Sequence, residues 1–420
     1  MWDPFAEFVH KKIEGGVDIY ASQWPGRSLQ RMAILVHAGC LQDAVGREGT
    51  AHLLEHLIRY GGKADGQKKI HEFFENLGGV FEPTTDLLST EYVFDGPATK
   101  EFLSEALTML YSRIFNFPAN PYLLKKEKGI VSAEFRKDNP WQYILDNNIR
   151  EDTTHFSQTL LKRCILPTEG LPEIIDKISV EDLRNFHCQF YFPANISIFT
   201  LGGLAVEEIF QLITDSPFSA VSGQRVKLPE TLIKLPPLTE NNFNFSAGEF
   251  LKECAGVNVS RIKISAVLPG NISEQLVKMC FEMIDEGLDD EVRENCNWSY
   301  GSKTERNNYA SLHHIALEFA DLPPDKVAET DEVIKRALFS LPNNKELFER
   351  KKLQSLNRLK LLDYNIEKLI EDGIAEITHN QRLPTFTEKY AEREAITMDD
   401  IKKVFSYLTA DRLWTLTQRP

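Results

Sequence analysis

The strongest restriction on the fold is a pattern that occurs twice, once near the end of each half of the chain. Ser179 and Thr397, 218 positions apart, are each followed within three positions by two acidic residues and an amphipathic run. Ser or Thr before a helix accepts hydrogen bonds from its first N–H groups, and acids favour its positive end. An apolar segment that predicts a strand follows each helix, at 196–201 and at 413–416. The repeat predicts internal duplication.

The length of the chain agrees with two domains, because 420 residues are too many for one ordinary hydrophobic core. The stretch 216–244, between the halves, is rich in Pro, Ser and Asn and predicts a linker. We therefore expect an N-terminal domain at 1–218, a linker at 219–239 and a C-terminal domain at 240–420.

Strand and helix patterns alternate within the first domain. Apolar or β-branched runs predict strands at 31–37 and 90–94, and glycine pairs end the predicted helices at 50–60 and 69–77. Two more amphipathic patterns predict helices at 100–115 and 123–136. This alternation predicts an α/β or α+β layer architecture in each half.

Composition and charge narrow the class of partner. Apolar residues at 42% and charged residues at 26% are typical of a globular protein, and the net charge is −14. An acidic surface disfavours nucleic acid and anionic membranes as partners. No apolar run is long enough to span a bilayer, and the N-terminus lacks the apolar stretch of a signal peptide.

The cysteines are scattered and form no C-x-x-C pair, which argues against both a cysteine zinc site and a disulfide framework. We expect them to be mostly buried free thiols in a reducing cytoplasm. Any metal site would therefore use histidine and carboxylate ligands. The six cysteines are Cys40, Cys164, Cys188, Cys254, Cys280 and Cys296.

The segment from His52 to His56 reads H-x-x-E-H, the reversed form of a zinc peptidase motif. On a helix, His52 and His56 project from one face and can bind one Zn²⁺ together. Glu55 lies beside that face, where it can take a proton from a metal-bound water. The motif therefore predicts a zinc peptidase.

A catalytic zinc site needs a third protein ligand. In the predicted helix at 123–136, Glu127, Ile130, Val131 and Glu134 share one face, so two carboxylates stand on the stripe that should face inward. Buried carboxylates need a metal, an Arg or a histidine partner, whereas a half-buried stripe would leave them solvated. The residues alone leave both alternatives open.

Together, Thr50 to His56 and the two downstream acids resemble the inverzincin family of zinc peptidases. Glu134 stands 78 positions after His56 and seven after Glu127, where that family has its third zinc ligand and the acid that precedes it. The resemblance implies that His52, His56 and Glu134 bind zinc, with Glu55 as general base. It also implies that Glu127 orients a ligand.

The resemblance extends beyond these residues. The segments 15–20, 85–92 and 178–195 are similar to the family's opening strand, its T-x-x-x-T-x-Y strand and its domain-closing helix with the Y-x-P-x-N turn. It implies an α+β fold of two homologous α/β-roll domains, each a mixed, mostly antiparallel sheet packed with helices. At Glu82-Pro83 the chain departs from the family, and proline removes a backbone donor from the strand expected to bind substrate.

In the second domain, Arg293 and Tyr300 resemble the family's Arg/Tyr pair, which implies a role in holding the substrate carbonyl. The alternative is that both are ordinary surface or packing residues. The resemblance further implies a peptide substrate and a chamber of four such domains, so we expect a homodimer or a pairing with a related subunit. The alternative function is a non-catalytic scaffold or peptide-binding subunit of the same fold.

Overall fold

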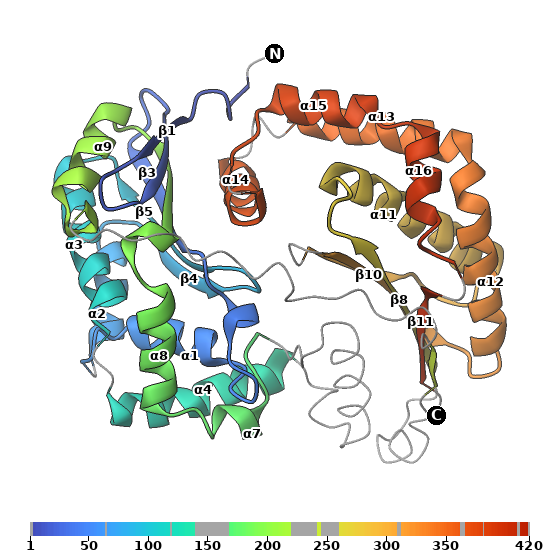
Figure 1. Cartoon of the computed structure of the whole chain (residues 1–420), viewed down its shortest axis with the longest axis horizontal. Helices are drawn as coiled ribbons and strands as arrows, with labels where there is room; N and C mark the ends of the chain where they lie inside the picture. Colours follow the sequence, from blue (N-terminus) through green and yellow to red (C-terminus); the bar gives the residue numbers. More distant parts are fainter. Residues whose placement is uncertain are drawn as a thin grey trace. The chain divides into compact units, whose positions relative to one another are not determined.

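The elements of the structure form two units, each with its own sheet and hydrophobic core. The computed structural model describes residues 3–63, 65–117, 120–138, 168–219, 242–244, 260–308, 312–361, 366–380, 382–409 and 412–418 (Figure 1). The first unit takes the described residues of 1–140, 165–228 and 363–386, and the second takes those of 141–164, 229–362 and 387–420.

The first unit is built on a six-stranded sheet in the order β1-β2-β6-β3-β5-β4. Strands β2 and β6 pair in parallel, and every other pair is antiparallel. β4 therefore forms one edge of this sheet. The strands are β1 (Val9–Lys12), β2 (Asp18–Gln23), β3 (Leu29–Val36), β4 (Phe81–Thr85), β5 (Thr90–Pro97) and β6 (Ile196–Gly202).

Helices of the first unit cover both faces of this sheet. Helix α14 lies on the face opposite to α2 and α3 (Figure 1) and contacts β3 and β6. Because both faces are covered, residues 32–36 of β3 are all fully buried, which explains the unbroken apolar run in the sequence. The helices are α1 (Thr50–Ile58), α2 (Gly66–Glu75), α3 (Lys100–Phe115), α4 (Pro121–Asp138), α7 (Pro172–Ile175), α8 (Val180–Phe190), α9 (Val206–Asp215) and α14 (Ile366–Asn380).

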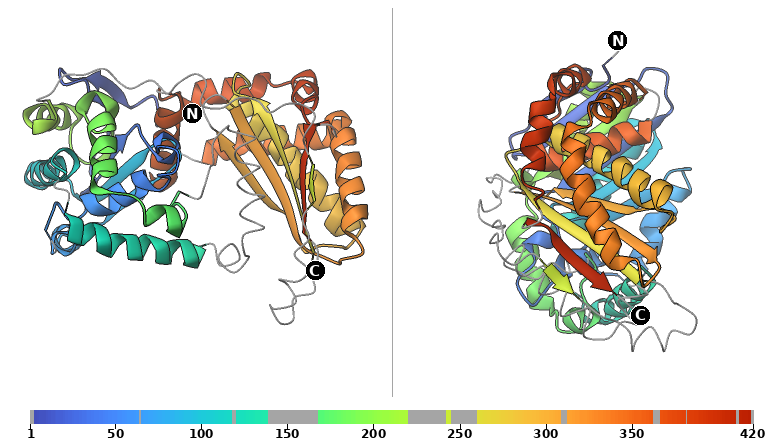
Figure 2. Two further views of the ribbon diagram at one scale, coloured as in Figure 1. Left: turned by 60° about the horizontal axis from the view of Figure 1, so that its bottom comes forward. Right: turned by 90° about the vertical axis from the view of Figure 1, so that its right-hand side faces the viewer.

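The second unit has a five-stranded sheet in the order β7-β11-β8-β10-β9. The yellow strand β8 and the red strand β11 lie side by side in it (Figure 2). Strands β7 and β11 pair in parallel, and the remaining pairs are antiparallel, as in the first sheet without β1. The strands are β7 (Asn242–Asn244), β8 (Ser260–Pro269), β9 (Lys303–Asn308), β10 (Leu312–Leu322) and β11 (Trp414–Gln418); the helices are α11 (Glu274–Asp289), α12 (Val327–Ser340), α13 (Lys345–Leu361), α15 (Phe386–Ala395) and α16 (Met398–Phe405).

The predicted helix starts at Ser179 and Thr397 are present with the same local geometry. Each hydroxyl accepts a hydrogen bond from the N–H group three residues on, and that residue's carboxylate, Asp182 or Asp400, accepts one from the backbone N–H of Ser179 or Thr397. These reciprocal bonds satisfy N–H groups that the first helical turn leaves free. The α+β class expected from the sequence is confirmed.

The predicted domain limits, 1–218 and 240–420, remain a prediction, and the predicted linker lies almost wholly outside the described residues. The structure adds one exchange between the sequence ranges. Helix α14 belongs by sequence to the second range but packs on the sheet of the first unit, where Gly373 lies against the ring of Phe199. A Cβ at position 373 would come within 2.5 Å of that ring.

The prediction about cysteines holds only in part. Cys40, Cys188, Cys280 and Cys296 form no disulfide, but only Cys280 is buried, whereas Cys188 is exposed and the other two are half-buried. Cys164 and Cys254 lie outside the described residues. Among the residues that the structure describes, no helix combines the length and the apolar character needed to cross a membrane.

A half-buried acid of β5, which lines a pocket together with residues of α14, predicts a pH dependence of stability. Glu91 accepts a hydrogen bond from Ser89, but burial raises its pKa to about 7. The unfolded chain loses this proton near its ordinary pKa of about 4.5, so the free energy of unfolding should fall by roughly 2–3 kcal/mol as pH rises from 4.5 to 7. Glu91→Gln should remove this slope in urea unfolding curves, and parallel wild-type and variant profiles would contradict the prediction.

Candidate metal centre

The start of helix α1 is fixed by one carboxylate and one glycine. Asp43 accepts hydrogen bonds from the N–H groups of Gly49 (2.7 Å) and Ala51 (2.9 Å), so it satisfies donors at the positive end of the helix. Gly49 has a φ of 96°, and a Cβ there would come within 2.6 Å of the carbonyl oxygen of Glu169. The backbone that enters α1 therefore requires glycine.

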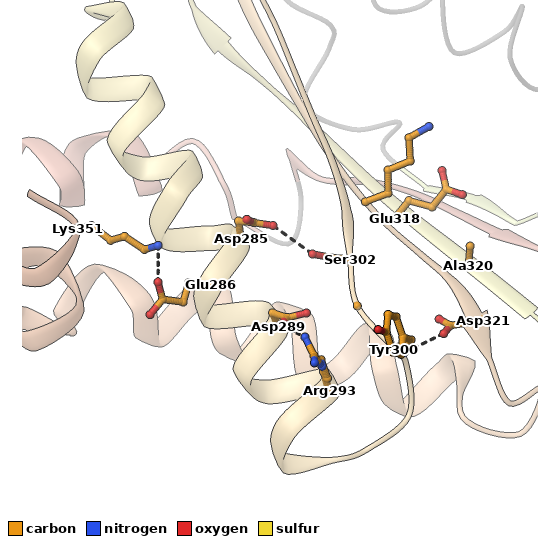
Figure 3. A pocket seen from close by; sticks show the side chains of 12 residues that line it. Asp285, Glu286, Asp289, Arg293, Tyr300, Ser302, Glu318, Ala320, Asp321 and Lys351 are labelled. Carbon is orange, nitrogen blue, oxygen red and sulfur yellow. Dashed lines mark hydrogen bonds and ion pairs between the residues drawn. The ribbon is translucent and has the colours of Figure 1, made fainter. Parts of the chain in front are cut away.

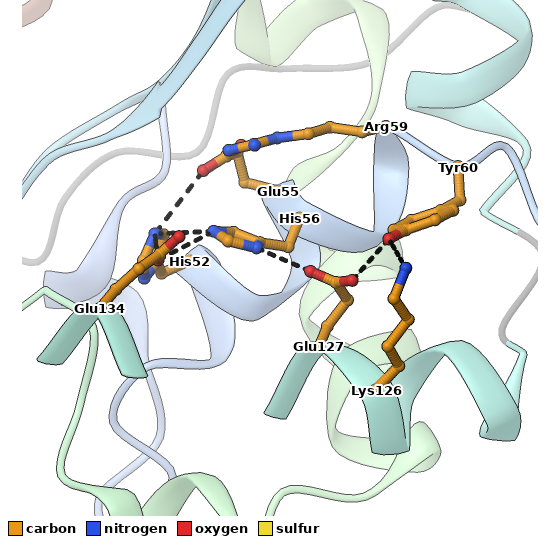
Figure 4. A network of polar contacts seen from close by, with 8 residues as sticks. All are labelled: His52, Glu55, His56, Arg59, Tyr60, Lys126, Glu127 and Glu134. Atoms are coloured by element: carbon orange, nitrogen blue, oxygen red, sulfur yellow. Dashed lines mark hydrogen bonds and ion pairs between the residues drawn. The ribbon is translucent and has the colours of Figure 1, made fainter. Parts of the chain in front are cut away.

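His52 and His56 lie on one face of α1, as their spacing predicts, and their Nε2 atoms are 3.2 Å apart. From α4, Oε2 of Glu134 lies 3.3 Å from Nε2 of His56 and 3.8 Å from Nε2 of His52 (Figure 4). Two ligand atoms of a tetrahedral zinc are about 3.3 Å apart, given zinc–ligand bonds of about 2.0–2.1 Å. Two of the three separations match this value, and the third, 3.8 Å between Glu134 and His52, is about 0.5 Å wider, so the group is close to the spacing of zinc ligands.

A second set of contacts fixes His56 through Nδ1, its other ring nitrogen. Oε2 of Glu127 lies 2.9 Å from Nδ1 of His56, and Oε1 accepts a hydrogen bond from the hydroxyl of Tyr60 at 2.6 Å. Lys126 donates to the same Tyr60 oxygen at 2.9 Å. Both Glu127 and Tyr60 are buried, so the contacts fix the orientation of the imidazole and leave its Nε2 free to face Glu134.

The two histidines differ in their electrostatic surroundings. Burial and the adjacent His56 lower the pKa of His52 to about 3. Burial also disfavours the charged form of His56, but hydrogen bonds to Glu127 and Glu134 outweigh it and raise its pKa to about 9. A hydrogen bond to His56 lowers the pKa of Glu134. Such opposed shifts in one small cluster are typical of a functional site.

Glu55 lies next to this cluster and is almost fully buried. Its Oε2 atom is 3.9 Å from Nε2 of His52, and its Oε1 atom accepts a hydrogen bond from Nε of Arg59 at 2.7 Å. His52, Glu55 and His56 form a group whose ligand atoms all lie within 4.8 Å of one another. A carboxylate held beside two histidines can serve as a base for a water molecule between them.

The stripe predicted on α4 is partly wrong. Glu127 and Val131 are buried, but Ile130 is exposed, and the side chain of Glu134 is 38% exposed. The buried face turns slightly away from Ile130, because Leu124 and Phe135 complete it. Glu134 therefore lies at the border of the stripe, where its carboxylate reaches the histidines from the solvent side.

Three residues of this network were missed as site residues by the sequence analysis: Arg59, Tyr60 and Lys126. Arg59 has a sequence signal, because it stands four positions after Glu55, the spacing of a helical ion pair. Tyr60 and Lys126 have none, since they meet only when α1 and α4 pack together.

The predicted pair in the second unit is brought together locally. The guanidinium of Arg293 lies 5.5 Å from the ring centre of Tyr300, and both line a pocket of about 640 Å³. Figure 3 shows Arg293 at the end of a helix and Tyr300 on the loop that follows. Arg293 stands in a single π-helical turn, 290–295, and also pairs with Asp289 at 3.3 Å. Turns of this kind occur often at functional sites.

Three other histidines, His37, His313 and His314, belong to no metal-capable group among the described residues. His37 is buried, and its Nε2 lies 2.8 Å from the hydroxyl of Ser197, so a polar partner inside the core satisfies this nitrogen. His313 and His314 are successive residues of β10, so their side chains leave opposite faces of the sheet. His155 lies outside the described residues.

Residues 21–165 match the family of the insulinases, peptidase family M16. The chloroplastic stromal processing peptidase of Pisum sativum is 25% identical over 173 residues, which cover 40% of this chain and 13% of that protein. The mitochondrial-processing peptidase subunit beta of Homo sapiens is 27% identical over 207 residues, 48% of this chain and 40% of that protein. The match thus spans less than half the length of these relatives.

Solved structures of similar fold cover the chain more fully. A protease from Helicobacter pylori has a TM-score of 0.80 at 15% identity, with 100% of both chains covered. An M16 inactive domain from Pseudomonas fluorescens has a TM-score of 0.78 at 15% identity, with 98% of each chain covered. At such identities the likeness shows the fold, and an inactive domain shares it. Residues 21–165, which contain the whole candidate metal group, are therefore a segment of the insulinase family, peptidase family M16.

Proposed function

We propose that this chain is a zinc-dependent endopeptidase that cleaves peptides or unfolded segments such as leader peptides or presequences. One observation carries the proposal: Nε2 of His52, Nε2 of His56 and Oε2 of Glu134 come within 3.2–3.8 Å of one another, with Glu55 beside them. Family membership supports the reaction class, and the processing peptidases among the relatives suggest the substrate class.

His52, His56 and Glu134 would hold the metal, and Glu127 with Tyr60 would keep His56 in the ligating orientation. A zinc ion bound there would supply a Lewis acid that polarises the scissile carbonyl and makes a bound water more acidic. Glu55 would take the proton of the attacking water and deliver it to the leaving amine. Because His56 has a pKa of about 9 without metal, it must release a proton to the solvent before it can act as a ligand.

The substrate backbone would add to β4, which is an edge strand of the first sheet among the described residues. Just beyond the two ends of the β4–β5 ladder, the N–H of Asp86 donates to the carbonyl oxygen of Ser89, and the N–H of Asp95 donates to the carbonyl oxygen of Val80. The even-numbered residues 80 and 86 therefore face the neighbouring strand. Backbone groups alternate in direction along a strand, so even-numbered β4 residues face β5 and odd-numbered ones face outward. Pro83 therefore stands at an outward position: it costs the sheet no hydrogen bond, but it removes one donor from the edge.

Restoring that donor should strengthen binding of extended peptides. We expect Pro83→Ala to lower KM by roughly 3- to 10-fold, the effect of one added hydrogen bond worth about 0.5–1.5 kcal/mol, with kcat little changed. The measurement is steady-state cleavage of a fluorogenic peptide. Thr84→Ala is the matched control, because its N–H faces β5. Equal KM values for the wild type and the Pro83→Ala variant would exclude this edge as the substrate strand.

Arg293 and Tyr300 would steady the substrate carbonyl or the oxyanion formed from it. Support comes from their proximity at 5.5 Å and from the shared pocket, where Tyr300 is 85% exposed and so available to a ligand. An arginine and a phenol are donors suited to an oxyanion. The two sheets, with the same order of parallel and antiparallel pairing, support our inference that the halves arose by duplication.

The chain would act as a homodimer or with a related subunit. Among similar proteins, one is named as a beta subunit and another as the first half of a periplasmic protease, PqqL from Escherichia coli. Since this chain carries both the metal group and the Arg/Tyr pair, we expect self-association. Sedimentation at micromolar concentration should give twice the monomer mass of 48.0 kDa, and a fully active 48.0 kDa species would contradict the expectation.

The rival function is a non-catalytic scaffold or peptide-binding subunit. It has support from the inactive domain of Pseudomonas fluorescens, which has a similar fold. Zinc titration of the purified chain, followed by mass-spectrometric mapping of cuts in a peptide library, separates the two. About one zinc per chain and chelator-sensitive cuts support the peptidase, whereas no zinc and no cuts support the scaffold. A cytoplasmic location remains a prediction from the sequence.

A further inference from the structure

We propose that Arg59 is a positioning residue for Glu55, holding this carboxylate with one oxygen turned toward the two histidines. The inference rests on the proposed function and deepens it. Arg59 stands directly after α1, one turn beyond Glu55. Its Nε lies 2.7 Å from Oε1 of Glu55, and a second guanidinium nitrogen contacts the same oxygen (Figure 4).

The two oxygens of Glu55 therefore have different surroundings. Both contacts from Arg59 go to Oε1, whereas Oε2 is the atom that lies 3.9 Å from Nε2 of His52. A planar guanidinium with two contacts on one oxygen restricts rotation of the carboxylate more than a single contact does. The oxygen left to receive a proton is thus the one beside the histidines.

Burial makes this contact strong. The side chain of Glu55 is 1% exposed and that of Arg59 is 18% exposed, so solvent screens the pair little. An ionised carboxylate this deep requires a cation or hydrogen-bond donors nearby, and Arg59 supplies both. Removing the guanidinium would leave Glu55 charged without this partner, or free to turn away from the histidines.

Arg59 is itself held from the neighbouring helix. Its backbone carbonyl accepts a hydrogen bond from the guanidinium of Arg113 on α3, which also donates to the carbonyl of Gly66 at 3.2 Å. The end of α1 and the start of α2 are therefore tied to α3. A side chain that starts from such a fixed backbone can place a base with the accuracy that proton transfer needs.

The kinetic test compares Arg59→Met with Arg59→Lys in the full chain loaded with zinc. We expect Arg59→Met to lower kcat by about 10- to 100-fold, the effect of a base displaced by about 1 Å, with KM changed less than about 3-fold. Arg59→Lys keeps the charge with a smaller donor group and should recover part of kcat. Lys69→Met, which removes the exposed pair between Lys69 of α2 and Asp65 just before that helix, is the matched control and should leave kcat unchanged.

A second test needs neither zinc nor activity. In metal-free protein, Arg59→Met should lower the urea midpoint clearly, but it should have little effect in the presence of Glu55→Gln, because the buried charge is then gone. The proposal would be overturned if the two substitutions shifted the urea midpoint additively. It would also be overturned if the wild type were active and the Arg59→Met variant had the same kcat. A wild type that binds no zinc and cleaves nothing would instead refute the proposed function, and with it the need for a positioned base.

Discussion

Glu55→Gln should abolish peptide hydrolysis while the chain still binds about one zinc ion. We expect kcat to fall by roughly 10²- to 10⁴-fold, the usual contribution of a general base, because the amide has nearly the same shape but cannot accept the proton. The proposal gives Glu55 no metal contact, although its Oε2 lies 3.9 Å from Nε2 of His52, nearly as close as Oε2 of Glu134 at 3.8 Å, so the two roles need this experiment.

The measurement pairs single-turnover cleavage of a fluorogenic peptide with zinc content by atomic absorption. Glu72→Gln, on the exposed face of helix α2, is a control that repeats the chemical change away from the metal group. Normal cleavage by the Glu55→Gln variant would refute the base assignment. Loss of zinc together with activity would instead make Glu55 a ligand.

Glu134→Gln should have the other large effect, loss of the metal itself. Its carboxylate closes the three-atom group with His52 and His56, and an amide oxygen is a weak zinc ligand. We expect zinc affinity to fall by more than about 100-fold and hydrolysis to disappear at limiting zinc. Glu127→Gln changes only the contact with Nδ1 of His56, so it should lower zinc affinity by about 10- to 100-fold.

Competition with a fluorescent zinc chelator would measure both affinities under the same conditions. Zinc affinity should be highest for the wild type, lower for the Glu127→Gln variant and lowest for the Glu134→Gln variant. If Glu134→Gln binds zinc as tightly as the wild type, the third ligand lies elsewhere and the proposed site is wrong. If instead Glu127→Gln is the weaker binder, Glu127 and Glu134 have exchanged roles.

Two members of the candidate metal group follow from local rules and could therefore be predicted. A helix places residues four apart on one face, so His52 and His56 had to converge once 50–58 became helical. The capping pairs at Ser179 and Thr397 are equally local, and the helix predicted at 100–115 has those bounds in the structure. The third acid needed a family resemblance, because spacing alone left it open.

Other features depend on which elements pack together, and only the tertiary structure decided them. Ile130 is exposed because α4 turns its Leu124–Val131–Phe135 face inward, and Glu127 meets Tyr60 only across the contact between α1 and α4. Helix α14 packs on the first sheet although it begins more than 160 residues after the end of β6. Local backbone preferences determine whether a segment forms a helix or a strand, whereas burial of apolar surface between distant segments determines which other elements it packs against.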